Sequence, residues 1–272
     1  WDVSCERQIE VSGPDSERLI QLMTPRDISK AVIGQGLYAP LCDENGLLIN
    51  DPILIKFAPD NWWVSIADSD VRLWARGLAF GLGLDVQIRE AAIWPLAVQG
   101  PKAEELVSRV FGEAARSIRF FRSKMLDFQG HSMMVMRSGY SKQGGFEIYL
   151  NDPALAEPLW NELFKQGADL RVRAGGPNLI ERIESGLLSY GNDMNFTHNP
   201  VECGLDIYMD LDADIDAMSL KALRALRGKH VHQLVGIVFD EAVEFDDFRV
   251  EADGELVGDV RSQVWSPRYN KF

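Results

Sequence analysis

Two stretches of this sequence repeat one pattern, RQIEVSGPDSERLIQLM at residues 7–23 and LAVQGPKAEELVSRVF at residues 96–111. In each stretch a strand-like apolar run ends at Gly-Pro, and a run with apolar residues at helical spacing follows. Glycine permits a tight turn, and proline fits the first turn of a helix. The pattern therefore predicts a strand, a turn and an amphipathic helix twice. The apolar faces of the two helices consist of Leu19, Leu22 and Met23, and of Leu106, Val107 and Val110.

The segments that follow the two helices also match each other. After the first helix, the pattern predicts strands at 37–42, 52–57, 62–66 and 85–88, with a helix at 68–79. After the second, it predicts strands at 124–128, 133–137, 145–150 and 169–172, with a helix at 153–166. Each half thus begins with a strand and a helix and ends with a helix and a strand, and the predicted fold class is α+β with duplicated βαββαβ units.

This organisation predicts three domains. Residues 1–90 form the first βαββαβ unit, residues 91–205 the second with a helical connection, and residues 206–272 a C-terminal β-barrel-like domain that we expect to be incomplete. Short strands at 233–239 and 248–250 and a hairpin at 254–258 make this last part β-rich. Because the chain starts at Trp1 rather than Met, we expect the natural protein to extend beyond both ends.

The composition is that of a globular protein, with 272 residues, 46% of them hydrophobic, and a net charge of −13. It contains neither a basic stripe for nucleic acid nor an apolar run of ~18 residues for a membrane, so we expect neither partner. Cys5, Cys42 and Cys203 form no CxxC motif and no disulfide framework, which favours a cytoplasmic location. His230 and His232 have no nearby Cys or acidic partner, so we expect surface or strand histidines rather than a metal site.

Asp51 stands directly before a very apolar strand, in the stretch Ile49-Asn50-Asp51-Pro52. One interpretation is a turn residue, because Asn-Asp-Pro is good turn chemistry. The other is a partly buried carboxylate that faces a cleft, where it could bind a polar ligand or handle a proton.

A glycine-rich loop at 137–145 leads into a strand in which Phe146, Ile148 and Leu150 alternate with Glu147 and Tyr149. A lone glutamate on a strand usually points to water. Paired with Tyr149 and a glycine-rich loop, Glu147 can instead line a pocket. A third stretch, 181–194, predicts a helix that carries Arg182 and Glu184 and ends at Gly191.

Together these stretches resemble the glycine-cleavage T-protein (aminomethyltransferase) superfamily over nearly the whole chain. The markers stand in the family's order: strand-Gly-Pro-helix, Asp51, Gln99-Gly100-Pro101, Gly139-Tyr140 through Glu147, and Glu184-x-Gly186 through Tyr190-Gly191-Asn192-Asp193. The resemblance implies a three-domain cloverleaf with tetrahydrofolate in its central channel.

Within that superfamily the chain is most similar to the dimethylsulfoniopropionate demethylases, in residues 1–8, 49–52, 65–70 and 265–268. T-proteins usually carry Asp-Asp where this chain has Asn50-Asp51, and Thr-Gly-Glu at 141–143. They often carry an Arg at the place of Asn178 and basic residues near Gln233. These departures argue against aminomethyl transfer from a lipoyl carrier.

The resemblance also implies roles for six residues. Asp51 takes the position of the family's essential aspartate and is the expected catalytic residue. Glu147 matches the glutamate that holds the pterin edge, and Tyr140 matches the aromatic residue of the same loop. Tyr38, Ser65 and Tyr149 match further positions of the folate or substrate site.

The implied reaction moves a methyl group from a small sulfonium zwitterion, dimethylsulfoniopropionate, to tetrahydrofolate, giving methylmercaptopropionate and 5-methyltetrahydrofolate. Positioning of the two reactants contributes ~7–11 kcal/mol to such a reaction, so we expect no metal. The alternatives are a related folate-dependent aminomethyltransferase or demethylase with another donor, and a non-catalytic folate-binding protein. A homodimer is compatible with the sequence, which does not set the oligomeric state.

Overall fold

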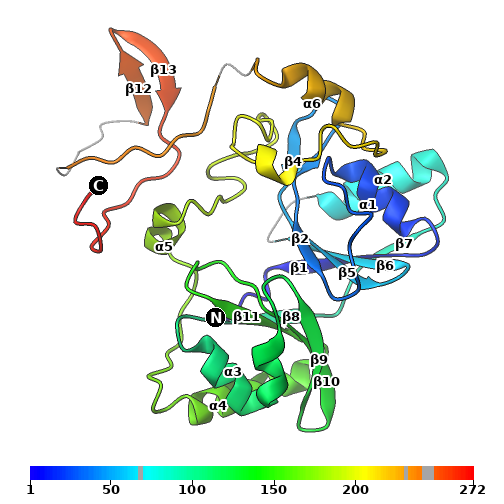
Figure 1. Cartoon of the computed structure of the whole chain (residues 1–272), viewed down its shortest axis with the longest axis vertical. Helices are drawn as coiled ribbons and strands as arrows, with labels where there is room; N and C mark the ends of the chain where they lie inside the picture. The colour runs from blue at the N-terminus through cyan, green and yellow to red at the C-terminus, as the bar shows by residue number, and fades with distance from the viewer. Residues whose placement is uncertain (67–69, 230–231, 241–247) are drawn as a thin grey trace.

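The computed structural model describes residues 1–66, 70–229, 232–240 and 248–272. Its first sheet has the strand order β2-β5-β6-β1-β7 and is antiparallel throughout. The strands are β1 (Arg7–Ser12), β2 (Gly36–Tyr38), β5 (Ile53–Ala58), β6 (Asn61–Ile66) and β7 (Gln87–Glu90). Helices α1 (Ser16–Met23) and α2 (Val71–Leu82) cover one face of this sheet (Figure 1). The start of the helix predicted at 68–79 lies outside the described residues.

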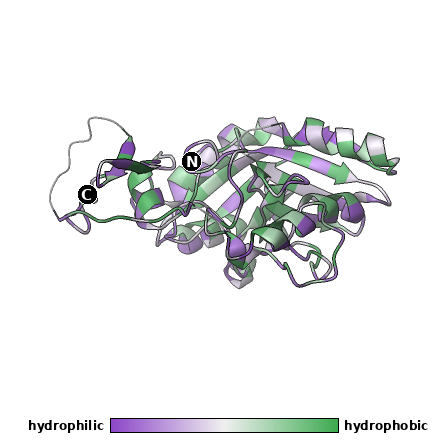
Figure 2. Ribbon diagram, turned by 90° about the horizontal axis from the view of Figure 1, so that it is seen from above, coloured by the Kyte–Doolittle hydropathy of each residue, from purple (hydrophilic) through white to green (hydrophobic). Residues whose placement is uncertain are grey.

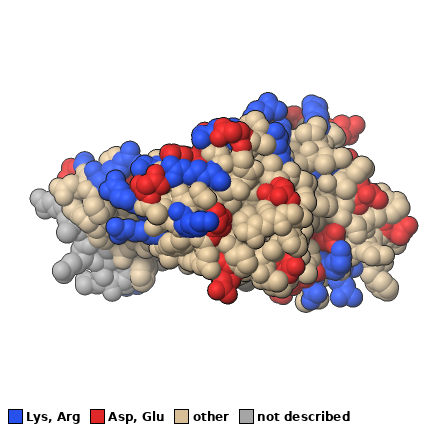
Figure 3. All heavy atoms as spheres, turned by 90° about the horizontal axis from the view of Figure 1, so that it is seen from below, with Lys and Arg blue, Asp and Glu red and all other residues tan. Residues whose placement is uncertain are grey.

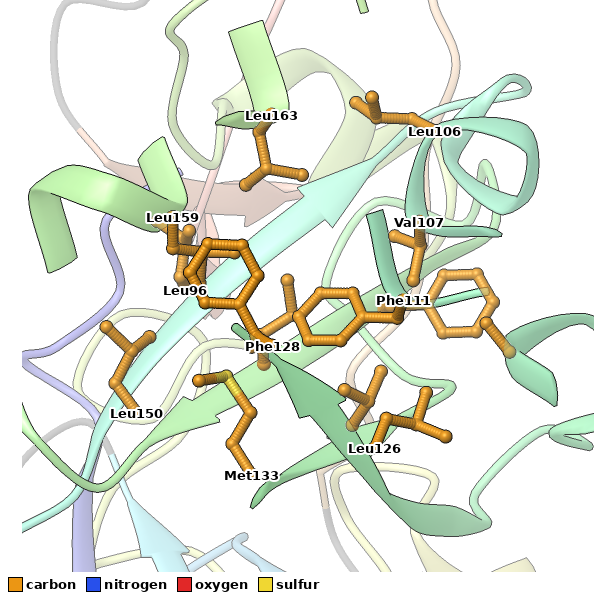
Figure 4. Close-up of a cluster of buried hydrophobic side chains, with 14 of the residues drawn as sticks. Leu96, Leu106, Val107, Phe111, Leu126, Phe128, Met133, Leu150, Leu159 and Leu163 are labelled. Atoms are coloured by element: carbon orange, nitrogen blue, oxygen red, sulfur yellow. The ribbon is translucent and has the colours of Figure 1, made fainter. Parts of the chain in front are cut away.

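The second sheet is also antiparallel and has the order β8-β11-β10-β9. Its strands are β8 (Trp94–Gln99), β9 (Ser123–Phe128), β10 (His131–Met136) and β11 (Gly145–Leu150). Helices α3 (Ala103–Phe111) and α4 (Ala156–Gln166) and the 3-10 turns η1 (Glu113–Ser117) and η2 (Pro153–Leu155) accompany it. Figure 4 shows the core between α3, α4 and this sheet, where Phe111 and Phe128 lie among aliphatic side chains.

The two sheets face each other across a cluster made of Ile55, Trp63, Met134, Met136 and Tyr149. Side chains alternate across a strand, so each strand buries one set of residues under its helices and the other between the sheets. The arrangement is therefore helices, sheet, sheet, helices (Figure 1). A polar residue that a central strand such as β11 turns away from its own helices lies between the sheets.

The two Gly-Pro turns have the same local geometry. Gly13 has φ +122° and Gly100 has φ +118°, in the region that favours glycine. A Cβ at Gly13 would lie 2.6 Å from the carbonyl oxygen of Asp85, so the turn also requires the absence of a side chain. The strand, turn and helix predicted at 7–23 and at 96–111 are confirmed in both places.

A third group of elements connects the first sheet to the C-terminal half. The short strands β3 (Leu41–Cys42) and β4 (Leu48–Asn50) form a hairpin. It packs against residues from 188 to 223, including the 3-10 turn η3 (Asp206–Tyr208) and helix α6 (Leu220–Leu226). Beyond them, the hairpin β12 (Arg249–Ala252) and β13 (Glu255–Asp259) lies to one side of the two sheets (Figure 2).

Several expectations from the sequence are corrected. In each half, three strands of the main sheet lie between the two helices, instead of the two of a βαββαβ unit. Residues 169–172 form a turn instead of a strand, and Arg171 has φ +61° there. Helix α5 (Leu179–Glu184) stops well before Gly191, because Gly186 with φ +63° follows it. Residues 206–272 contain α6 and are not purely β, and residues 233–239 form no strand. Leu22 is only partly buried, whereas Ile20 is buried in the core with Leu19 and Met23.

The three cysteines are free, as expected: Cys5 is exposed, and Cys42 and Cys203 are buried. None of the described helices is long and apolar enough to cross a membrane. Basic and acidic side chains lie interspersed on the face that Figure 3 shows. Of the two histidines considered above, His232 is exposed and His230 lies outside the described residues.

Candidate functional site

Tyr38 and Asp51 meet at the edge of the first sheet. The Tyr38 hydroxyl donates a hydrogen bond of 2.7 Å to Asp51 Oδ2. Tyr38 is itself held by Arg26, which donates to the Tyr38 carbonyl oxygen, and by an edge-to-face contact with the Tyr208 ring at 4.7 Å. Burial raises the pKa of Tyr38, and the Asp51 carboxylate raises it further. Tyr38 therefore stays protonated and orients the carboxylate of Asp51.

The glycine-rich loop brings Tyr140 close to this pair. The side chain of Gln99 anchors the loop: its Nε2 donates to the carbonyl oxygen of Ser138 at 3.0 Å, and its Oε1 accepts from Ser141 Oγ at 2.7 Å. A Cβ at Gly139, which has φ +138°, would lie 1.9 Å from Gln99 Nε2, so only glycine fits. Burial raises the pKa of Tyr140 to about 12, and Asp51 is among the charged groups that act on it.

Glu147 lies between the two sheets and does not point to water. Its side chain accepts a hydrogen bond of 2.5 Å from Ser138 Oγ and one of 3.4 Å from Tyr149 Oη. Burial raises the pKa of Glu147. The alternation predicted for this strand is confirmed, because Phe146, Ile148 and Leu150 pack under the helices on the other face. The face that looked polar is buried because the first sheet covers it.

Ser65 and Tyr149 complete this second group. Ser65 is buried on β6, with the Gln8 side-chain amide donating to its Oγ at 2.9 Å. Tyr149 is buried on β11. Burial raises the pKa of Tyr149, as do Glu147 and Glu6, whereas the hydroxyl of Ser65 lowers it. Ser65 and Tyr149 therefore lie close to each other across the space between the sheets.

The sequence interpretation missed two members of this group, Glu6 and Gln8. Burial raises the pKa of Glu6 to about 8, with Glu147 as the second cause. Gln8 is fully buried, and its Nε2 donates both to Ser65 Oγ and to the carbonyl oxygen of Glu6. The strand alternation Gln8-Ile9-Glu10-Val11 could have revealed Gln8. Glu6 precedes the strand, so no periodicity marked it.

The six predicted residues thus form two neighbouring groups. Tyr38, Asp51 and Tyr140 form the first, and Ser65, Glu147 and Tyr149 the second. Ile53 pairs with Ser65 in the sheet, and Asp51 precedes Ile53 by two residues, which is about 7 Å along a strand. The carboxyl groups of Asp51 and Glu147 therefore belong to one region at the junction of the two sheets.

The second group suits a flat heterocycle that carries several N–H donors. Gln8 Oε1 is buried and has no hydrogen-bond partner among the described residues. Its orientation follows from the carbonyl oxygen of Glu6, which needs the N–H donor that Gln8 Nε2 supplies. A buried acceptor without a partner costs free energy, which a ligand's N–H group would recover. Together with Glu147, it matches the edge of a pterin, so the residues present fit the group that the resemblance implies.

One open cavity lies outside this junction, and a second reaches the six residues only through Tyr140. One of about 660 Å³, lined by residues such as Leu96, Trp160 and Arg171, contains none of the six predicted residues. The other, about 570 Å³, is lined by Tyr140, Asn178 and Arg182 among others. We place the site by its buried carboxyl groups, because cavity size alone does not identify chemistry. Within the described part of the chain, no three His, Cys, Asp or Glu side chains are grouped to hold a metal ion.

The third stretch singled out in the sequence, residues 181–194, is joined to the C-terminal segment by side-chain contacts, which we call the clamp. Arg182 forms a buried ion pair with Asp193 and donates to Ser262 Oγ at 2.7 Å. Ser262 in turn donates to Asp193 Oδ1 at 2.5 Å. Glu184 accepts a hydrogen bond from Ser266. These contacts connect residues 182–193 to the C-terminal segment. Within the same stretch, the carbonyl oxygen of Leu188 accepts a hydrogen bond of 2.5 Å from the Tyr140 hydroxyl.

Comparisons with known proteins agree with this geometry. The model of the GCVT N-terminal domain matches residues 1–213. Dimethylsulfoniopropionate demethylase DmdA of Ruegeria pomeroyi is 48% identical over 271 residues, which cover 99% of this chain and 74% of that protein. An aminomethyltransferase of Clostridium botulinum (strain Okra / Type B1) is 30% identical over 280 residues, covering 100% of this chain and 75% of that protein.

A solved structure has the same fold. The crystal structure of glycine cleavage system aminomethyltransferase T from Bartonella henselae matches with a TM-score of 0.86 at 24% identity. The match covers 99% of this chain and 74% of that one. The mixed helix and strand architecture predicted from the sequence is therefore confirmed as that of the T-protein.

Proposed function

Because this chain belongs to the GCVT family of aminomethyltransferases, we propose that it is a tetrahydrofolate-dependent demethylase that takes a methyl group from dimethylsulfoniopropionate. The observation that carries this proposal is the 48% identity to a dimethylsulfoniopropionate demethylase over 99% of the chain. The identity to an aminomethyltransferase is lower, at 30%, and supports the same cofactor. The products are methylmercaptopropionate and 5-methyltetrahydrofolate.

The residues between the sheets supply what folate binding requires. Glu147 accepts N–H donors from the pterin ring in a charge-assisted contact, and Ser138 fixes its direction through the 2.5 Å hydrogen bond. Gln8 offers a second buried acceptor next to it. Tetrahydrofolate, when bound, supplies the nucleophilic nitrogen N5 that accepts the methyl group.

The methyl donor is a cation whose leaving group is a neutral thioether. Tyr38, Tyr140 and Tyr149 are the candidate rings to attract this cation, in contacts worth ~0.5–2 kcal/mol each. Asp51, held by Tyr38 at 2.7 Å, orients the folate and accepts the proton that the nitrogen releases. The work of the chain is to position the two reactants and to handle one proton.

We also propose the finer architecture that the sequence predicts. The domains are 1–90, 91–205 and 206–272, and the first two are copies of one unit with three sheet strands between two helices, in a cloverleaf around the site. The equal geometry at Gly13 and Gly100 supports the duplication. Residues 169–172 form no strand, so the second unit lacks a counterpart of β7. A cytoplasmic location agrees with the free cysteines. A homodimer is part of this proposal and is tested by the mass in solution.

The experiment is a transfer assay with tetrahydrofolate and dimethylsulfoniopropionate, in which 5-methyltetrahydrofolate is detected by mass. Parallel reactions contain an aryl methyl ether or an aminomethylated lipoyl carrier as the donor. We expect transfer from the sulfonium compound alone. Transfer from the lipoyl carrier alone would identify an aminomethyltransferase, and folate binding without transfer from any donor would identify a non-catalytic protein.

A further inference from the structure

Arg26 lies in a loop after α1 whose backbone is held by several hydrogen bonds. The side chain of Gln21 spans this loop, and its Nε2 donates to the carbonyl oxygens of Thr24 at 3.1 Å and Arg26 at 2.9 Å. Its Oε1 accepts from the N–H of Ile28 at 3.1 Å. Thr24 Oγ1 donates to the carbonyl oxygen of Pro40 at 2.8 Å, which joins the loop to the segment after β2. The Arg26 side chain therefore starts from a fixed backbone.

The guanidinium of Arg26 lies against the rings that lead to Asp51. Its Nη1 donates to the carbonyl oxygen of Tyr38, and the hydroxyl at the other end of Tyr38 donates to Asp51 at 2.7 Å. The guanidinium carbon lies 5.8 Å from the centre of the Tyr208 ring. That ring packs edge-to-face on Tyr38, with 4.7 Å between the ring centres. Tyr38 and Tyr208 therefore connect a fixed positive charge to the carboxylate of Asp51.

The segment that carries Tyr208 is joined to the same loop. The backbone N–H of Asp210 donates to the carbonyl oxygen of Pro25 at 2.9 Å, and Asp210 Oδ2 accepts from the N–H of Asp27 at 2.8 Å. Asp210 thus holds the loop in place and forms no ion pair with Arg26. Two separate chain segments, 24–28 and 206–210, fix the positions of the guanidinium and the ring beside it.

Most hydrogen-bond donors of this half-buried guanidinium are unused. A guanidinium carries five N–H groups, and among the described residues only Nη1 of Arg26 has a hydrogen-bond partner. Partial removal from water disfavours the charge, and burial accordingly lowers the pKa of Arg26. A ligand carboxylate would recover this loss, because it accepts two parallel N–H···O bonds from the planar guanidinium. The donors left on Arg26 therefore fit a carboxylate.

We propose that Arg26 binds the carboxylate of the methyl donor and thereby selects a zwitterion over a simple sulfonium cation. This inference rests on the proposed function, which supplies the donor. In dimethylsulfoniopropionate, two methylene groups separate the sulfonium from the carboxylate. With the carboxylate on Arg26, the sulfonium lies at the rings of Tyr38 and Tyr208, on the side of Asp51. Each charge of the zwitterion thus meets an opposite charge, Arg26 at one end of Tyr38 and Asp51 at the other.

The experiment compares two methyl donors at saturating tetrahydrofolate. Dimethylsulfoniopropionate carries the carboxylate, and dimethylpropylsulfonium has a methyl group in its place. Loss of a hydrogen bond to a charged group should raise KM for dimethylsulfoniopropionate about 10- to 150-fold in Arg26→Gln, with a much smaller change in kcat. Kinetics with dimethylpropylsulfonium should stay the same in this variant. Arg26→Lys keeps the charge without the planar pair of donors, so its KM should rise less.

Two controls separate this role from a structural one. Arg18→Gln removes the same charge from an exposed position of α1 and should leave both donors unaffected. Calorimetric titration with tetrahydrofolate alone should give the wild-type affinity in every variant, which shows that the site is intact. The wild-type protein provides a further arm without any substitution, because its KM for dimethylpropylsulfonium should exceed that for dimethylsulfoniopropionate about 10- to 150-fold.

The outcomes are distinct. Equal KM values of the wild-type protein for the two donors would overturn the role of Arg26, as would an Arg26→Gln variant that loses activity with both donors to the same extent. Retention of the wild-type KM for dimethylsulfoniopropionate in Arg26→Gln would overturn it as well. Absence of methyl transfer from either sulfonium donor in the wild-type protein would instead overturn the proposed function, and this inference with it.

Discussion

Replacement of Glu147 by Gln is the sharpest test of how the site holds folate. The amide has nearly the same shape, and its carbonyl oxygen can still accept the 2.5 Å hydrogen bond from Ser138. What disappears is the negative charge and one acceptor for the pterin N–H groups. A hydrogen bond to a charged group is worth ~1.5–3 kcal/mol, so the dissociation constant for tetrahydrofolate should rise about 10- to 150-fold.

The same change should affect stability in the opposite direction. Burial raises the pKa of Glu147, so the native state holds this proton to a higher pH than the unfolded chain does. That contribution to stability is present at low pH and is lost as the pH rises through the raised pKa. Glu147→Gln has no such loss, and at pH 8.5 it should melt at or above the temperature of the wild-type protein.

Isothermal titration with tetrahydrofolate and thermal melts at pH 6 and 8.5 measure both effects, with Glu90→Gln as the matched control. Weaker binding together with undiminished stability is the predicted combination. Unchanged affinity would remove Glu147 from the folate site. Weaker binding with a lower melting temperature at both pH values would mean that the variant disturbs the packing between the sheets rather than the contact with folate.

Three further outcomes follow from the contacts. Asp51→Asn should fold normally and slow single-turnover methyl transfer by ~10²–10⁴-fold; if rate and affinity are both retained, Asp51 is only a turn residue. Asp193→Ala leaves Arg182 buried without its partner and should destabilise the fold by ~3–5 kcal/mol in urea titrations; an unchanged midpoint would contradict the clamp. The pKa of Glu6 is raised to about 8, so the stability of the free protein should fall as the pH rises from the ordinary glutamate range to about 8, and Glu6→Gln should lack this fall. Parallel pH profiles of stability for the two proteins would exclude this contribution.

Much of the fold could be predicted because local rules determine it. At Gly100-Pro101 the residues favour a turn before a helix, and from Phe146 to Leu150 the apolar alternation favours a strand. Both predictions are confirmed. The predictions that were wrong lie where the sequence supports two local structures about equally well. Residues 169–172 have strand-like alternation but carry two charged residues, and the chain turns there. Helix α5 ends early because Gly186 offers a left-handed C-terminus before Gly191 does.

The candidate site was only partly predictable for a different reason. Motif matches identified Asp51 and Glu147, and alternation placed Glu147 and Tyr149 on one face. Whether that face meets water or protein depends on the second sheet, whose contacts are distant in sequence: Trp63 and Tyr149 lie 6.1 Å apart by their ring centres. Glu6 could not be inferred, because it lies outside any periodic element and acts only through its neighbour on β11.

The most direct test of the central claim is a single-turnover reaction of this chain with tetrahydrofolate and dimethylsulfoniopropionate, followed by mass analysis of both products. We predict equal amounts of 5-methyltetrahydrofolate and methylmercaptopropionate, with neither formed when folate is left out. Tight binding of tetrahydrofolate without any methylated product, from this or any other donor, would contradict the assignment as a demethylase.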